Sequence, residues 1–458
     1  MQVQLLLPHR PGTALMIPCL SLPSRIHALC MAGCLAITCA PAAAQIPQFL
    51  ETPPISYLET PPDDAITRLQ RRVDAGEVRL TFAKQHGYLK SVLKHLHVSA
   101  ESQALVFSKT SFQSARISSK RPRAIYFGDD VYIGWVNGGD MEFSVVDPKL
   151  GTNFYVLRQQ EAAKPKFSHR TQECLQCHSS ALTLAVPGHM VRSVYVRPDG
   201  EPDYEAGTFL TDSTSPFKQR WGGWYVTGTH GSQRHLGNLQ LAEGEKAADV
   251  NVDKGANVTD LSTRFETSAY LTPHSDIVAL MVLEHQTALH NRLTRASFLT
   301  RMALYEDRTH PNEDRSAETE RTMRESADAL VQQLLFVGEM RLTDSIAGTS
   351  GFREQFAARG PRDSQGRSLR DFDIETRLFK HPCSYLIYSR AFDSLPQPLK
   401  QVVYRRLWNV LTAAETDDAF SHLTATDRTV ILGILRETKQ NLPAYWSLKS
   451  RQTTTSTE

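Results

Sequence analysis

The pentapeptide Cys174-Leu175-Gln176-Cys177-His178 is the pattern in this sequence with the most specific chemistry. Two thiols at this spacing can form thioether bonds with the two vinyl groups of one haem, and the histidine that follows then lies beneath the iron. A ring nitrogen of His178 would be the proximal axial ligand. We therefore expect one covalently bound haem c, held by Cys174, Cys177 and His178.

Three other interpretations of the motif stay open. A structural zinc site needs four ligands, but Cys383 stands alone, without a second Cys or His pair at similar spacing. A thioredoxin-like dithiol needs a buried strand before the motif, whereas residues 163–170 are polar and contain a proline. The third interpretation is a plain disulfide between Cys174 and Cys177.

The first 44 residues are typical of an export signal. An apolar run from Ala28 to Cys39 is followed by Ala40-Pro41-Ala42-Ala43-Ala44, which has small residues where a signal peptidase cleaves. The run is shorter than the about 20 residues that a bilayer span needs. We predict a signal peptide over residues 1–44 and a periplasmic or secreted protein. A buried helix, a membrane anchor or a lipoprotein attached at Cys34 are the alternatives.

Export changes the meaning of the cysteine count. Of the seven cysteines, only Cys174, Cys177 and Cys383 lie after residue 44. That is too few for a disulfide-stapled scaffold. Because an apolar stretch follows Cys383, we expect it to be a buried structural cysteine rather than a nucleophile paired with His381.

The function of such a haem depends on its second axial ligand. A His or Met ligand closes the iron and suits electron transfer, whereas an open position permits ligand binding or catalysis. His230 is the first candidate, in a Gly-rich segment shared with His235; the alternative is a turn between strands with surface histidines. His285 and Met281 rank next, on one face of an apolar helix where a methionine is usually part of the core.

Other side chains could support the haem. Trp221, Trp224 and Tyr225 could wall its pocket, and Met190 is expected to pack near it rather than bind the iron. Three arginines could pair with the propionates, although each is also a candidate for a solvated surface charge: Arg192, Arg220 and Arg234.

Around the motif the chain resembles c-type cytochromes. Leu184-Ala185-Val186-Pro187-Gly188 is similar to the leucine and Gly-rich turn that follow their haem-binding histidine, whereas Arg170 stands where small cytochromes c have an aromatic residue. The chain is also similar to large secreted bacterial cytochrome-c-domain proteins, in three segments: Arg121–Phe127, Trp221–Gly231 and Pro382–Leu386. The resemblance implies one haem c but no particular activity.

Composition excludes some classes of function. With 41% apolar and 22% charged residues and a net charge of +2, the 458-residue chain gives no reason to expect nucleic acid or an anionic membrane as a partner. No Ser-His-Asp signature, phosphate loop or dinucleotide fingerprint is present. A single haem-attachment motif also argues against the di-haem peroxidases.

The elements that must position the motif are predicted to form an α+β protein, with a β-rich N-terminal and haem-binding region followed by a mostly α-helical C-terminal region. The predicted regions are a signal peptide (1–44), a β-rich N-terminal region (45–160), a haem-binding cytochrome-c-like region (161–262), a helical region (263–448) and a disordered tail (449–458). Strands are expected at 124–127, 131–136, 143–146 and 191–196. Helices are expected at 65–75, 276–307 (capped by Ser275), 317–341, 399–414 and 427–441, and a flexible loop at 348–366.

These observations predict a periplasmic electron carrier with one haem, which exchanges electrons with a redox partner protein and has no membrane span once the signal is removed. The alternative is a haem-dependent oxidoreductase with an open or displaceable sixth iron position. It is favoured by the length of the chain after residue 44, which is several times what an electron shuttle needs. A non-catalytic module, with a sensing or structural haem, is a third hypothesis.

Overall fold

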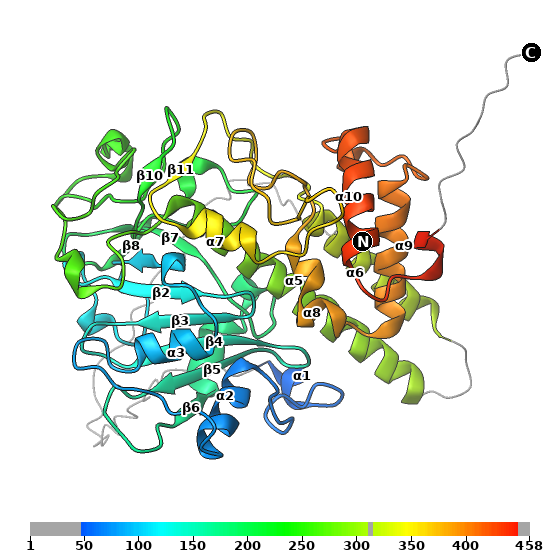
Figure 1. Ribbon diagram of the computed structural model, residues 1–458, viewed down its shortest axis with the longest axis horizontal. Coiled ribbons are helices and arrows are strands. Elements are labelled where there is room, and N and C mark those ends of the chain that lie inside the picture. The colour runs from blue at the N-terminus through cyan, green and yellow to red at the C-terminus, as the bar shows by residue number, and fades with distance from the viewer. Residues whose placement is uncertain (1–46, 310–314, 448–458) are drawn as a thin grey trace, which may run out of the picture. The chain divides into compact units, whose positions relative to one another are not determined.

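The computed structural model describes residues 47–309 and 315–447 (Figure 1). The predicted signal peptide (1–44) and tail (449–458) lie outside the described residues. The described chain contains α-helices and an antiparallel sheet, which confirms the α+β class. Most strands end by Thr229 and the long helices begin at Ile277, so the predicted change from strands to helices is also present.

Seven strands form one antiparallel sheet, in the order β6-β5-β4-β3-β2-β1-β9. Their bounds are β1 (Ala104–Val106), β2 (Arg123–Phe127), β3 (Val131–Trp135), β4 (Met141–Asp147), β5 (Gly151–Leu157), β6 (Phe167–Arg170) and β9 (Trp224–Tyr225). The predicted hairpins are confirmed, because β2, β3 and β4 pair consecutively through short turns. At the far edge β9 joins β1, with Tyr225 opposite Leu105.

Different helices cover the two faces of this sheet. Successive side chains of a strand point to opposite faces, so neighbours in β4 enter different cores. Val145 packs with α2 (Ala65–Asp74) and α3 (Leu89–His95), which lie in front of the sheet in Figure 1. Val146 packs in the core that surrounds α5 (Ile277–Thr309).

The start of α5 is tied to the sheet. Asp276 caps the helix, since its Oδ1 accepts a hydrogen bond from the Val278 backbone N–H at 2.8 Å. The prediction that Ser275 is the cap is wrong by one residue. The Ser275 hydroxyl instead donates to the Tyr225 carbonyl at 2.6 Å and accepts from the Leu105 N–H at 2.9 Å, which links α5 to β9 and β1.

The C-terminal helices pack in sequence beside α5, and Figure 1 shows them together, from green to red. They are α6 (Ala317–Leu334), α9 (Gln397–Leu411) and α10 (Ala425–Thr438). Each matches a predicted helix, but α6 ends seven residues earlier than expected, because Phe336 adopts a φ of 58° that a right-handed helix cannot contain.

The predicted loop over residues 348–366 contains a short helix, α7 (Phe352–Ala358). Phe352 and Phe356 are one helical turn apart and both are buried in the main core, which explains why this glycine-rich stretch folds. The prediction of a loop throughout this segment is therefore wrong.

The remaining α-helices and strands have nine residues or fewer. They are α1 (Gln48–Glu51), α4 (Gln172–His178), β7 (Arg192–Val196), β8 (Pro202–Leu210), β10 (Gly228–Thr229), β11 (Ala347–Gly348) and α8 (Arg390–Asp393). The strand predicted over residues 191–196 is confirmed as β7, which pairs with β8. In the described segments, none of the helices combines the length and the apolar character required to cross a bilayer.

Candidate functional site

The short helix α4 carries the motif and follows the edge strand β6 directly. Cys174, Cys177 and His178 are spaced so that they share one side of this helix. Cys174 is half-buried, Cys177 is exposed, and both are free thiols. The arrangement leaves both sulfur atoms available for covalent attachment.

The His178 ring is fixed by the backbone that follows it. Its Nδ1 lies 2.9 Å from the Gly188 carbonyl oxygen. Because a carbonyl oxygen can only accept a hydrogen bond, Nδ1 carries the proton and Nε2 keeps a free lone pair. A histidine that ligates a metal usually donates its other ring N–H in this way. The residue therefore fits the role of a proximal haem ligand.

Other contacts hold the His178 ring in place. The Gly188 N–H donates back to the His178 carbonyl at 2.8 Å, which closes a loop between the two residues. The Phe154 ring of β5 packs against the imidazole, with centroids 4.8 Å apart. Burial lowers the pKa of His178, which keeps the ring neutral and its lone pair available.

Asn291 of α5 clamps the residue after Gly188. Its Oδ1 accepts the His189 N–H at 2.8 Å, and its Nδ2 donates to the His189 carbonyl at 2.7 Å. A Cβ on Gly188 would lie 2.3 Å from Asn291 Oδ1, so the close approach requires glycine. The clamp fixes the position of the carbonyl that orients His178.

A buried polar network lies behind this clamp. The His189 ring is hydrogen-bonded to Ser144 Oγ at 2.8 Å and to Thr152 Oγ1 at 3.1 Å, and it packs 4.3 Å from the Tyr132 ring. The Tyr132 hydroxyl lies 2.9 Å from His290 Nδ1. Burial, with His290 nearby, lowers the pKa of His189 well below its ordinary value, so His189 is neutral.

These supporting residues were missed by the sequence analysis. Gly188 lies in the noted turn, but nothing local indicates that its carbonyl faces His178. Asn291 is 102 residues from His189, and only the packing of α5 brings them together.

The thiols differ from those of a redox dithiol. Burial, followed by the nearby carboxylates of Glu173 and Glu142, raises the pKa of Cys174 to about 12. A reactive dithiol has the opposite feature, a lowered cysteine pKa. The strand before the motif is also exposed at Ser168, His169 and Arg170 rather than buried. Both observations disfavour the thioredoxin-like interpretation.

His230 and His235 are buried, so the expectation of surface histidines is wrong. Their rings lie 4.7 Å apart, and His235 also contacts Trp221. His230 Nε2 accepts a hydrogen bond from the Asn257 N–H at 2.9 Å, so its lone pair already has a partner. None of these contacts involves α4. The geometry does not favour His230 as the second iron ligand.

The other ligand candidates also have their partners elsewhere. His285 Nε2 lies 2.7 Å from Ser384 Oγ, and its ring packs against Phe336. Met281 is part of the main core, as a methionine in an apolar helix usually is. Met190 is half-buried and lines a cavity beside the motif segment. Trp221, Trp224 and Tyr225 are likewise core residues.

The arginines suggested for the propionates are engaged in three different ways. Arg220 is 3% exposed and pairs with the fully buried Glu284 at 3.1 Å, so it is not a surface charge. Arg234 pairs with Asp253 at 2.6 Å. Arg192 lies over the Tyr204 ring, 5.3 Å from its centroid.

The possible metal-binding groups and the third cysteine after residue 44 also bear on the interpretation of the motif. In residues 47–309 and 315–447, no group of three or more His, Cys, Asp or Glu side chains could hold a metal ion. Cys383 is fully buried and burial raises its pKa to about 12, which agrees with a structural cysteine.

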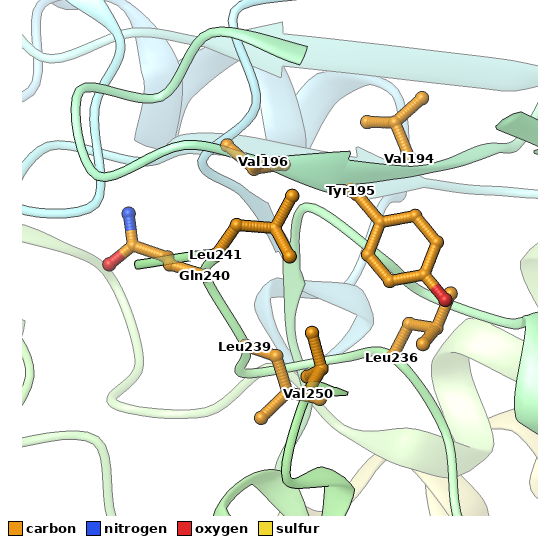
Figure 2. Close-up of a pocket in the computed structure, with 8 residues that line it drawn as sticks. All are labelled: Val194, Tyr195, Val196, Leu236, Leu239, Gln240, Leu241 and Val250. Atoms are coloured by element: carbon orange, nitrogen blue, oxygen red, sulfur yellow. The ribbon is translucent and has the colours of Figure 1, made fainter. Parts of the chain in front are cut away.

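Figure 2 shows a crevice between β7 and the loop that follows Leu236. Its volume is about 10 Å³, and its walls are mostly apolar, including Val194, Leu241 and Val250. A space of that size has room for no more than about one water molecule. The crevice is therefore not a candidate for a haem or a substrate.

No protein-family model, no curated protein and no solved structure matches this chain.

Proposed function

We propose that this protein is a periplasmic c-type cytochrome that transfers electrons through one haem bound at Cys174, Cys177 and His178. The observation that carries the proposal is the hydrogen bond from His178 Nδ1 to the Gly188 carbonyl, because it leaves Nε2 free to bind iron. When bound, the haem supplies one-electron Fe(III)/Fe(II) chemistry.

The chain's own residues attach and orient the group. Cys174 and Cys177 each provide a thiol for one thioether bond. His178 provides the axial nitrogen, and its orientation is set by Gly188 and the Phe154 ring. The export signal expected over residues 1–44 supports a periplasmic location, since haem is attached to this motif outside the cytoplasm.

Mass spectrometry of protein matured in the periplasm tests the proposal. We expect the wild-type chain and a Cys383→Ala control to carry one haem-sized adduct, and a Cys174→Ala/Cys177→Ala variant to carry none. The control removes the remaining cysteine after residue 44, so it separates loss of the motif from loss of any thiol. A wild-type chain without the adduct would contradict the proposal.

One observation favours a second candidate, a haem-dependent oxidoreductase with an open sixth position. The described contacts of His230, His285 and Met281 all lie away from α4. Absorption spectra separate the candidates. A low-spin ferric spectrum unchanged by cyanide and a ferrous spectrum unchanged by carbon monoxide support electron transfer, whereas a high-spin spectrum that shifts on ligand addition supports the oxidoreductase. In a His178→Ala variant we expect either spectrum to change, since the axial nitrogen is lost.

A further inference from the structure

A cavity of about 190 Å³ adjoins the segment that follows the motif. It lies between α5, the residues just after His178 and the end of β8, and Gln333 of α6 also contributes to its wall. By the same measure a single water needs about 10–15 Å³, so the space has room for a small organic molecule.

One side of the cavity is apolar. Leu184 and Met190 line it, and Leu182 and Leu210 stand at its mouth. Leu182 is 39% exposed and Leu210 is 41% exposed, so two large apolar side chains face water beside a cavity. Apolar side chains around a hollow that also holds a few polar groups are typical of small-molecule sites.

The wall of the cavity also carries a positive charge. Arg292 of α5 is half-buried, and its Nε donates to Gln333 Oε1 at 3.3 Å. In residues 47–309 and 315–447 its guanidinium forms no ion pair with a carboxylate. Burial, together with the charge of Arg295, lowers the pKa of Arg292, and the charge of Asp212 partly opposes this shift. A partly buried cation without a counter-charge is costly, and a bound anion would offset that cost.

The acidic side chain in the wall, Asp212, offsets that cost only in part: its charge raises the pKa of Arg292, but the two side chains form no ion pair in the described residues. Asp212 Oδ1 accepts hydrogen bonds from the Thr214 N–H at 2.8 Å and the Thr214 hydroxyl at 2.7 Å. The Asp212 carboxylate is therefore hydrogen-bonded within its own turn and not to the Arg292 guanidinium, which leaves that group able to bind a ligand anion.

We propose that this cavity binds the carboxylate of a small apolar molecule, with Arg292 as the anchor and the leucines and Met190 against the apolar part. Guanidinium and carboxylate match in shape and can form two parallel hydrogen bonds. Such a carboxylate has two sources, a free organic acid or a propionate of the haem. Only the second source rests on the proposed function.

The test uses hexanoate as the probe and 1-hexanol as its uncharged counterpart, measured by calorimetric titration of the haem-loaded protein. For a free-acid site we expect hexanoate to bind and hexanol to bind at least tenfold more weakly. Arg292→Gln should weaken hexanoate at least tenfold, whereas Arg324→Gln, an exposed arginine of α6, should leave it unchanged. Leu182→Glu, at the exposed mouth, should also weaken hexanoate and does not depend on how Arg292→Gln folds.

The two sources give different results. If a haem propionate occupies the cavity, the haem-loaded protein will not bind hexanoate, whereas the haem-free Cys174→Ala/Cys177→Ala variant will bind it. In that case Arg292→Gln will also shift the reduction potential of the haem, and Arg324→Gln will leave it unchanged. Absence of Arg292-dependent binding in both forms overturns the inference. A wild-type chain that carries no haem contradicts the proposed function instead, and hexanoate titration of that chain still tests the cavity.

Discussion

Two histidine-bearing regions of this protein are tied to α5 in different ways. The first, which we call the thiol-histidine segment (Cys174–Met190), is held directly by Asn291. The second, the paired-histidine loop (His230–His235), packs on Trp221, next to Arg220, which is paired with Glu284 of α5. Both contain buried histidines, yet only the first leaves an imidazole nitrogen free beside two thiols.

The difference shows that a histidine is not suited to bind a metal merely because it is buried. His178 donates its N–H to a carbonyl and keeps a lone pair, whereas His230 uses its lone pair to accept a backbone N–H. Which ring nitrogen carries the proton is set by the neighbouring backbone group. We therefore interpret the paired-histidine loop as a region that stabilises the fold, and the thiol-histidine segment as the candidate site for haem binding.

The largest effect is expected from the ion pair between Arg220 and Glu284, next to the paired-histidine loop. Arg220→Ala would leave Glu284 buried without its partner, which costs about 3–5 kcal/mol of unfolding free energy. Burial raises the pKa of Glu284 and Arg220 lowers it, so the variant should raise that pKa further. Urea denaturation measures the loss.

The control for Arg220→Ala is an exposed ion pair. Arg324 and Glu320 on α6 are 3.6 Å apart and largely exposed, so Arg324→Ala should change stability by no more than about 0.5 kcal/mol. If the two variants lose similar amounts, or if Arg220→Ala alters the spectrum of the proposed haem more than the stability of the fold, the assignment of a structural role is wrong.

The chemical residues of the proposed site can be named from the sequence, but their supports cannot. Cys174, Cys177 and His178 are proposed from spacing alone, because their chemistry requires only that they lie on one turn of chain. The carbonyl of Gly188 and the amide of Asn291 depend on a tertiary contact, which local pattern does not encode. The same limit explains why His230 is predicted as an iron ligand. A Gly-rich turn with histidines does not indicate whether a backbone N–H will donate a hydrogen bond to their ring nitrogens.

In the fold, too, features with a local sequence pattern were predicted and features that depend on tertiary contacts were not. The strands from β2 to β4 and the helices α2 and α5 have strong local periodicity and were predicted within a few residues. The pairing of β1 with β9 joins Leu105 to Tyr225 and has no local signal. The helix α7 was missed because its glycine and charged neighbours outweighed Phe352 and Phe356, whose helical spacing could have identified it.

The second prediction tests the clamp on the thiol-histidine segment. Asn291→Ala removes both partners of the His189 backbone, and two buried polar groups without partners should cost about 2–3 kcal/mol. We also expect a shifted haem reduction potential, because the Gly188 carbonyl is no longer fixed. Gln332→Ala is the matched control, since it removes an amide that donates to Asp328 and contacts neither His189 nor the cavity. An unshifted potential in Asn291→Ala would contradict the positioning role.

Per pH unit, the smallest effect is a pH dependence in the paired-histidine loop. Burial, reinforced by His230, lowers the pKa of His235 to about 3, from about 6.5 for an exposed histidine. Below pH 6.5 the unfolded chain therefore binds a proton at His235 that the folded chain does not, so stability falls as the pH drops towards 3. The loss is about 1.4 kcal/mol per pH unit in that window. His235→Phe should remove this slope at little cost at pH 7, because phenylalanine keeps an aromatic ring against Trp221 and carries no titratable group. Denaturation between pH 7 and pH 4 measures the slope, with the exposed His97→Asn as the control; equal slopes in both variants would show that His235 is not the acid-sensitive group.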